Sequence, residues 1–266
     1  MVRDAMTELD SIESMLDEQR RFPPPEPIAS EAHITDLDEY QSMWRRSIAD
    51  PAGFWGEIAE EFEWYRKWDE VASWDFVDAQ IKWFEGAQLN VSVNCLDRHI
   101  AAGRAGEPAI SFEADDGEMS TYSFSEVLEQ VCRLGNLLRV NGVTKGDRVT
   151  VYMPMIPELA FTLLACARIG AIHSVVFGGF SADSLAQRIV DCTSDVLVTT
   201  DAGIRGGKLV PLKSTGDAAI ELAAEQGVKV RCVIVNHRAG DGIGEGSPGW
   251  VAGRDVDMEE GMAAQG

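Results

Sequence analysis

The run Arg205-Gly206-Gly207-Lys208 carries the residue types in this sequence that are best suited to hold an anion. Two adjacent glycines let a backbone approach a ligand closely, and the flanking guanidinium and ammonium groups are both suited to phosphate. The run is not a Walker loop, because Ala202 stands where that motif has its first glycine and Leu209 stands where Ser or Thr would hold magnesium. On residue chemistry alone, a surface turn with two solvated bases is the favoured interpretation.

A second glycine pair, in Phe177-Gly178-Gly179, directly follows a predicted strand. Such a turn can expose backbone N–H groups and an aromatic ring for stacking, although by itself it is typical of an ordinary strand-to-helix connection. The nearby Ser181 is predicted to cap a helix rather than to act as a nucleophile, because GGFSA does not match the GxSxG elbow.

Other candidate groups give weaker signals. Cys95 and His99 stand four residues apart, but no second Cys/His pair follows at ligand spacing, so a packed cysteine and a hydrogen-bonded histidine are favoured over a zinc site. His173 lies in an apolar run and is predicted to be a core histidine. The five cysteines form no CxxC pair and have apolar neighbours, which predicts reduced core thiols. The sequence assigns no catalytic residue and no metal ligand.

The elements that must position the glycine pairs lie at 147–213, where β-branched runs alternate with helical patterns. Strands separated by helical crossovers predict a parallel sheet, and such sheets bind ligands beyond the carboxyl ends of their strands. Both glycine pairs follow the predicted strands closely. The predicted strands are 149–152, 172–176 and 196–199, and the predicted helices are 156–169 and 182–191.

Upstream of this segment, a hairpin over 109–112 and 119–122 is predicted to lead into a capping box, Ser123 with Glu126. The helix it opens is predicted to end near Asn141-Gly142. Further elements are expected in regions 36–65 (helices with a break at 51–53), 76–84 (extended), 94–102 (helix), 217–225 (helix) and 230–235 (strand). The tryptophans of the first region are predicted to clamp its helices onto a body. The last thirty residues, including Gly240 to Gly246, are predicted to be loop.

Together these patterns predict an α/β fold, with an amino-terminal helical and hairpin region followed by a mostly parallel sheet flanked by helices. Three segments are expected: an acidic, Pro-containing mobile tail at 1–34 with a short helix before Arg20, a helical region at 35–104, and a first α/β part at 105–266.

The charge balance excludes one class of function. The chain has 44 acidic and 23 basic side chains, a formal net charge of −21, which disfavours binding to nucleic acid. The first 80 residues hold 20 acids and 7 bases, whereas 151–215 hold 5 of each, so the acidic surplus vanishes around the proposed anion site. The sequence shows no apolar run long enough to span a membrane and no signal-peptide pattern, which favours a soluble cytoplasmic protein.

A longer stretch carries a family resemblance. VYMPMIPELAFTLLACARIGAIHSVVFGGFSADSLAQRI, followed by TTDAGIRGGK and preceded upstream by WFEGAQLNVSVNCLDRH, resembles the AMP-forming acetyl-CoA synthetases of the adenylate-forming superfamily over about residues 54–236. The resemblance implies that acetate is activated with ATP and Mg²⁺ and then transferred to coenzyme A. It also implies that Arg205, Gly206, Gly207 and Lys208 lie at the coenzyme A nucleotide, with Phe177, Gly178 and Gly179 near coenzyme A.

The family's adenylation motifs have no counterpart here. The given sequence contains neither a Ser/Thr/Gly-rich loop ending in Pro-Lys-Gly nor the carboxy-terminal domain whose lysine the family uses for adenylation. We therefore expect the amino-terminal, incomplete part of a larger adenylate-forming domain, inactive alone, with a separate carboxy-terminal half as one possible partner. The alternatives are a propionate–CoA ligase fragment, a non-catalytic nucleotide- or coenzyme A-binding module, and a truncated or frameshifted product without activity.

Overall fold

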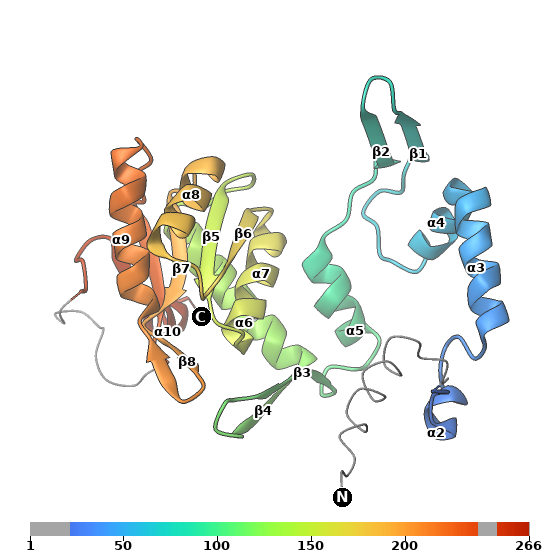
Figure 1. Cartoon of the computed structure of the whole chain (residues 1–266), viewed down its shortest axis with the longest axis horizontal. Helices are drawn as coiled ribbons and strands as arrows, with labels where there is room; N and C mark the ends of the chain where they lie inside the picture. Colours follow the sequence, from blue (N-terminus) through green and yellow to red (C-terminus); the bar gives the residue numbers. More distant parts are fainter. Residues whose placement is uncertain (1–21, 239–248, 266) are drawn as a thin grey trace, which may run out of the picture. The chain divides into compact units, whose positions relative to one another are not determined.

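The structure is a computed structural model that describes residues 22–238 and 249–265. It divides into two compact units, Met1–Ala59 and Glu60–Gly266, coloured along the sequence in Figure 1. The predicted division at 1–34, 35–104 and 105–266 stays a prediction. Among the described residues, no helix has the length and apolar character needed to cross a membrane.

A five-stranded sheet forms the centre of the second unit, and every pairing in it is parallel. β5, β7 and β10 are buried almost throughout, as expected for inner strands rich in β-branched residues and covered on both faces. The spatial order is β11-β10-β7-β5-β6, with bounds β5 (Arg148–Met153), β6 (Ile172–Phe177), β7 (Val196–Thr200), β10 (Cys232–Asn236) and β11 (Asp255–Asp257). The predicted α/β fold is thus confirmed.

Helices cover both faces of this sheet (Figure 1). Successive side chains of β5 alternate between two hydrophobic cores, with Val149 and Val151 in one and Tyr152 in the other. The first core includes α6 (Phe124–Val140), α7 (Pro157–Ile169) and α10 (Met258–Ala263), and the second includes α8 (Ala182–Cys192) and α9 (Leu212–Glu225).

The local signals at α6 and α7 explain where these helices begin and end. Ser123 accepts a hydrogen bond from the Glu126 amide and donates its own amide to the Glu126 carboxylate at 2.7 Å, so the predicted capping box is confirmed. α7 begins at Pro157 and ends at Ile169, and its C-cap, Gly170, has a φ of +78° that favours glycine. The predicted hairpin before α6 is present as β3 (Pro108–Glu113) and β4 (Met119–Ser123).

The segment before this hairpin is tied to α7 by polar contacts. The predicted helix at 94–102 consists of a π-helical turn, Val93–Asp97, followed by α5 (Arg98–Ala101). Asp97 forms a two-pronged ion pair with Arg168 of α7, at 2.8 and 2.9 Å. The side-chain amide of Asn90 (Nδ2) also donates to the carbonyls of Ala167 and Arg168. These bonds fix the segment to the end of α7.

A hairpin that the sequence pattern did not predict lies at β1 (Glu70–Asp75) and β2 (Gln80–Glu85). The extended segment expected within 76–84 is present, since residues 80–84 lie in β2, whereas the first residues of that range form the turn. The Asp75 carboxylate accepts hydrogen bonds from the amides of Val77 and Asp78, which closes the turn locally.

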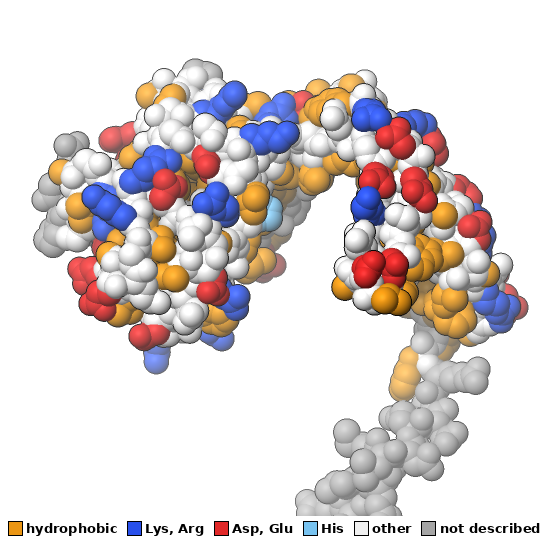
Figure 2. Space-filling model, turned by 90° about the horizontal axis from the view of Figure 1, so that it is seen from above, with side chains coloured by type: hydrophobic (Ala, Val, Ile, Leu, Met, Phe, Trp, Pro, Cys, Tyr) orange, Lys and Arg blue, Asp and Glu red, His pale blue; other side chains and the backbone are white. Residues whose placement is uncertain are grey.

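The first unit contains helices only in its described part, residues 22–59: α2 (Glu26–Ala29), α3 (Leu37–Ala49) and α4 (Pro51–Ala59). The break between α3 and α4 falls at Asp50 rather than at 51–53, because the Asp50 carboxylate caps the Gly53 amide. One face of α3 exposes Leu37, Tyr40, Trp44 and Ile48, and hydrophobic side chains are visible at the surface of this part of the molecule in Figure 2. The predicted clamping role of the tryptophans stays untested. The short helix expected before Arg20 lies outside the described residues.

The carboxy-terminal region differs from its prediction. Residues 255–263 form β11 and α10 rather than loop, and α9 starts at Leu212, five residues before the predicted start. A buried ion-pair network explains both differences: Lys213 binds Asp217 and Asp255 at 2.8 and 2.9 Å, and Arg254 binds the same two carboxylates at 2.6 Å. Gly240 to Gly246 lie outside the described residues.

Two further predictions about burial were wrong. His173 is exposed, because β6 is an edge strand and its side chains are covered on fewer sides than those of an inner strand. Cys95 is also exposed, so not all cysteines are core thiols. Burial raises the pKa of the Cys166 thiol to about 12 and that of Cys232 to about 11, which leaves these two thiols protonated near neutral pH.

Candidate functional site

The Arg205-Gly206-Gly207-Lys208 run forms the tip of a two-stranded hairpin, β8 (Gly203–Arg205) with β9 (Lys208–Val210). This hairpin follows the carboxyl end of β7 (Figure 1). Gly206 and Gly207 have φ values of +56° and +72°, as required by the tight two-residue turn that joins such strands. Arg205 pairs directly with Lys208, so both basic side chains stand on one face of an exposed tip.

The Phe177-Gly178-Gly179 run is held by a buried tyrosine. The Tyr152 hydroxyl donates toward the carbonyls of Gly178 and Phe180, at 3.2 and 2.9 Å. Burial raises the pKa of the Tyr152 phenol, so it stays a hydrogen-bond donor at neutral pH. The exposed ring of Phe177 meets Phe180 edge to face, with ring centroids 5.9 Å apart. Ser181 caps α8, as predicted.

Both glycine-containing segments pack on the same residue, Leu212. A Cβ atom added at Gly178 would lie 3.6 Å from Leu212 Cδ2 and 3.3 Å from the carbonyl oxygen of Met153. One added at Gly203, at the base of the hairpin, would lie 3.3 Å from Leu212 Cδ1. The fold therefore brings the base of the basic hairpin and the phenylalanine–glycine turn together beside the carboxyl end of β5.

Hydrogen bonds of Asp201 fix the residue that precedes the hairpin. This buried carboxylate accepts hydrogen bonds from the amides of Ala202, at 2.6 Å, and Arg238, at 2.9 Å. The Asp201 amide donates to the carbonyl of Asn236 at 3.0 Å. These bonds join the segment after β7 to the segment after β10, which the sequence pattern did not predict.

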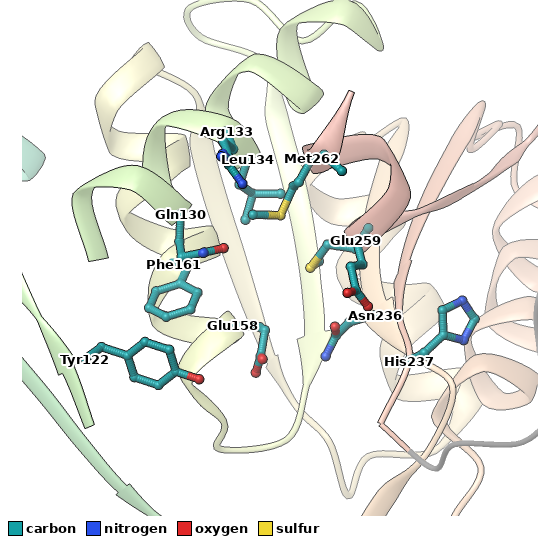
Figure 3. A pocket seen from close by; sticks show the side chains of 12 residues that line it. Tyr122, Gln130, Arg133, Leu134, Glu158, Phe161, Asn236, His237, Glu259 and Met262 are labelled. Atoms are coloured by element: carbon teal, nitrogen blue, oxygen red, sulfur yellow. The ribbon is translucent and has the colours of Figure 1, made fainter. Parts of the chain in front are cut away.

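A cavity of about 440 Å³ opens near the carboxyl end of β10, and none of the predicted site residues lines it. Figure 3 shows Glu158 and Asn236 near its centre, with Tyr122 on one side and His237 on the other. A second cavity of about 310 Å³ shares Tyr122 and Glu158 and is also lined by Ile204 of the hairpin. The Asn236-His237-Arg238 run directly after a predicted strand was a signal that could have identified this region.

His237, which lines the larger cavity, contacts two residues outside the lining. His237 Nε2 lies 2.7 Å from Asp257 Oδ2, and its ring stacks on Trp250 with centroids 6.4 Å apart.

In residues 22–238 and 249–265, no cluster of three or more His, Cys, Asp or Glu side chains is arranged to hold a metal ion. His99 packs against Phe124, with ring centroids 4.8 Å apart.

Comparison with known proteins gives this arrangement a family context. The family model described as AMP-binding enzyme matches residues 97–257, and the one described as acetyl-coenzyme A synthetase N-terminus matches residues 40–95. The acetyl-coenzyme A synthetase of Alkalilimnicola ehrlichii is 47% identical over 244 residues, covering 91% of this chain and 36% of the relative. That of Rhizobium meliloti is 48% identical over 233 residues, covering 87% and 35%.

Among solved structures, the acetoacetyl-CoA synthetase from Streptomyces lividans matches with a TM-score of 0.72 and 28% sequence identity. The match covers 90% of this chain and 35% of that one. The chain thus spans little more than a third of the length of the curated relatives it matches. Because the AMP-binding model matches more than half of the chain, the chain belongs to the AMP-binding enzyme family, and it carries the amino-terminal segment typical of acetyl-coenzyme A synthetases.

Proposed function

We propose that this chain is the coenzyme A-binding, amino-terminal part of an acetate–CoA ligase. The complete enzyme would convert ATP, acetate and coenzyme A to acetyl-CoA, AMP and pyrophosphate, with Mg²⁺ bound to ATP. The proposal is supported by relatives named as acetyl-coenzyme A synthetases and by the match to their amino-terminal segment. In this proposal the substrates are small molecules, the compartment is the cytoplasm, and the remaining portion of the ligase is the partner.

The coenzyme A nucleotide would bind at the tip of the β8–β9 hairpin. Arg205 can bind a phosphate through two parallel hydrogen bonds, and Lys208 can add a point charge from the same face of the hairpin. Phe177 offers an exposed ring for stacking, and Gly178 and Gly179 offer backbone that a ligand can approach closely. We assign no residue of this chain to ATP, Mg²⁺ or acetate.

One observation carries this assignment: the two glycine-containing segments pack on the same side chain, Leu212. A basic hairpin alone is an ordinary surface feature. Its base lies against the same leucine as an aromatic–glycine turn at the carboxyl end of a parallel sheet, which is the position where such folds bind nucleotides.

A second candidate is a module that binds coenzyme A or another nucleotide without chemistry. It is supported by the same hairpin tip and phenylalanine–glycine turn, which offer a nucleotide phosphate and ring contacts without any catalytic group. A ligase for propionate is a further alternative within the same site. The binding test below applies to all three. Pyrophosphate exchange by this chain combined with the remaining portion of the ligase separates the ligases from the module.

The test is an isothermal calorimetric titration of coenzyme A into the 266-residue chain. Arg205→Glu removes a charge-assisted contact and adds repulsion, so we expect affinity to fall about tenfold to a hundredfold, since each bond to a charged group contributes about 1.5–3 kcal/mol. Arg188→Glu is the matched control, because Arg188 is an exposed arginine on α8 and the charge change is identical. If the Arg205→Glu chain and the unmodified chain bound coenzyme A with equal affinity, the hairpin tip would be an ordinary solvated turn and not a binding site.

A further inference from the structure

The backbone around Gly179, in the candidate coenzyme A turn, is held by one buried side chain. The Tyr152 hydroxyl lies 3.2 Å from the carbonyl oxygen of Gly178 and 2.9 Å from that of Phe180. These two hydrogen bonds fix the chain on both sides of Gly179. Tyr152 lies on β5, 26 and 28 positions before its two partners, so the contact is made by the fold and not by the local sequence.

The turn itself contributes little that could hold its shape. Gly178 and Gly179 have no side chains, and glycine has more backbone freedom than any other residue. Both positions are also crowded. A Cβ atom added at Gly179 would lie 2.6 Å from Phe177 Cε1, and one added at Gly178 would lie 3.3 Å from the carbonyl oxygen of Met153. A turn that has to be built from glycines needs contacts from elsewhere in the fold to keep one conformation.

Packing alone does not explain why a tyrosine stands at position 152. The Tyr152 side chain is 1% exposed and belongs to the second hydrophobic core, together with Val176, Leu185 and Leu212. A phenylalanine would fill the same space, and a buried hydroxyl costs free energy unless it forms hydrogen bonds. The carbonyls of the turn supply those bonds, so the hydroxyl ties the core of the sheet to the turn.

The direction of these carbonyls decides which backbone donors face solvent. The peptide bonds of the described residues are trans, and a trans peptide points its carbonyl and the following amide in opposite directions. Because the Gly178 carbonyl points toward the buried Tyr152, the amide of the exposed Gly179 points away from it. The bond to the Phe180 carbonyl turns the Ser181 amide away in the same manner.

We propose that Tyr152 is a positioning residue for coenzyme A, whose hydroxyl holds the phenylalanine–glycine turn in the conformation that presents the Gly179 amide to the ligand. This inference rests on the proposed function. The turn packs on Leu212 through Gly178, and the basic hairpin packs on the same leucine through Gly203, so a fixed turn also keeps its position relative to the hairpin. A turn that is already ordered loses less conformational entropy when a ligand binds, which raises affinity.

The first part of the test is calorimetric titration of coenzyme A into variants of the 266-residue chain. Tyr152→Phe removes the hydroxyl and keeps the ring, so we expect affinity to fall about threefold to tenfold. Replacing Tyr152 by para-aminophenylalanine puts a hydrogen-bond donor back in the same place and should restore the affinity of the unmodified chain. Thr162→Val is the matched control, because Thr162 of α7 also has a buried hydroxyl, which donates to the Glu158 carbonyl at 2.7 Å on the other face of the sheet. It should bind coenzyme A normally.

The second part measures the turn directly, without coenzyme A. The Phe180 amide donates to the Phe177 carbonyl at 3.0 Å, so its hydrogen-exchange rate reports opening of the turn. We expect this amide to exchange at least about threefold faster in Tyr152→Phe, and the para-aminophenylalanine chain to reverse the change. The Ile172 amide, which donates to the Asp147 carbonyl at 2.7 Å at the other end of β6, should exchange at the same rate in every chain.

Equal coenzyme A affinity of the Tyr152→Phe chain and the unmodified chain would overturn the inference, and so would unchanged exchange at Phe180. Equal losses of affinity in Tyr152→Phe and Thr162→Val, or no recovery with para-aminophenylalanine, would also overturn it, because the hydroxyl would then act only through general stability. If the unmodified chain does not bind coenzyme A, the proposed function fails as well. If that chain binds and Arg205→Glu weakens the binding while Tyr152→Phe does not, this inference alone fails.

Discussion

Lys213→Met should destabilise the second unit more than any exposed ion-pair change, because the lysine is one of two cations in a buried network. The Lys213 side chain is 1% exposed, and its ammonium contacts both carboxylate oxygens of Asp217 at 2.8 Å, Asp255 at 2.9 Å and the carbonyl of Gly249 at 3.0 Å. Removing it leaves Asp255, whose side chain is fully buried, with Arg254 as its one charged partner in residues 22–238 and 249–265.

The magnitude follows from the energetics of broken buried pairs. Removing one partner costs about 3–5 kcal/mol, and we expect the lower end, about 3 kcal/mol, because Arg254 still binds both carboxylates. For a unit of this size, about 3 kcal/mol corresponds to a fall in melting temperature of about 6–12 °C. Urea unfolding followed by tryptophan fluorescence measures the change. Lys82→Met is the matched control, since Lys82 pairs with Glu85 on an exposed hairpin and its loss should leave the unfolding midpoint unchanged.

The same network predicts a pH dependence with a definite sign. Burial by itself would raise the pKa of Asp255, but hydrogen bonds from Arg254 and Lys213 hold that pKa below its ordinary value. A carboxylate whose pKa is lowered on folding contributes stability above its unfolded pKa of about 3.9, and that stability is lost as pH falls through the folded pKa. The difference between Lys213→Met and the unmodified chain should therefore shrink below about pH 4. A variant within about 0.5 kcal/mol of the unmodified chain at pH 7 would refute the buried-network reasoning.

Two further outcomes are expected. A polypeptide of these 266 residues should catalyse no acetate-dependent pyrophosphate exchange above a no-enzyme control. The reason is that the sequence lacks the Pro-Lys-Gly phosphate loop that would stabilise the transition-state charge. Exchange by highly purified protein would contradict this expectation. Arg168→Leu should lower the free energy of unfolding, measured in urea, by about 1.5–3 kcal/mol, because Asp97 loses two hydrogen bonds to a charged group. A double-mutant cycle with Asp97→Asn should show non-additivity above about 0.5 kcal/mol. Additive losses would mean that the ion pair contributes nothing to stability.

The central part of the fold could be predicted from sequence because its signals are local. β5, β6 and β7 lie within one or two residues of their predicted bounds, since short β-branched runs bounded by turn residues mark strands. The start of α6 was predicted from the Ser123 and Glu126 capping box, whose two bonds involve residues only three apart. Each of these patterns can be recognised without knowing any distant contact.

The errors fall where distant residues decide the structure. β11 and the early start of α9 depend on Lys213 and Asp255, which are 42 positions apart and meet only in the folded chain. The exposure of His173 depends on β6 being an edge strand, and strand order is not visible in a local pattern. The helix α10 was also missed, because Met258 and Met262 pack in the core while the three residues between them are acidic or glycine.

The same distinction applies to the candidate site. Residue chemistry marked the basic hairpin tip and the phenylalanine–glycine turn as candidates, because glycine pairs and phosphate-binding side chains can be recognised in a sequence, but only the family resemblance favoured a site there over an ordinary turn. Their meeting at Leu212 and the cavity around Glu158 and Asn236 could not be predicted, since both depend on which helix and strand ends share an edge of the sheet.

The contacts that hold the β8–β9 hairpin affect how tightly its tip could bind a phosphate group. Its base is fixed by the Asp201 hydrogen bonds and by the contact of Gly203 with Leu212, whereas the two basic side chains at the tip are exposed. Binding a phosphate would therefore order two long side chains at about 0.5–1.5 kcal/mol each, with little cost for the backbone, because the turn is already set by Gly206 and Gly207. Two charge-assisted bonds from Arg205 can exceed that cost. A flexible loop with the same residues would lose more entropy on binding, so the rigid hairpin favours recognition by these two side chains.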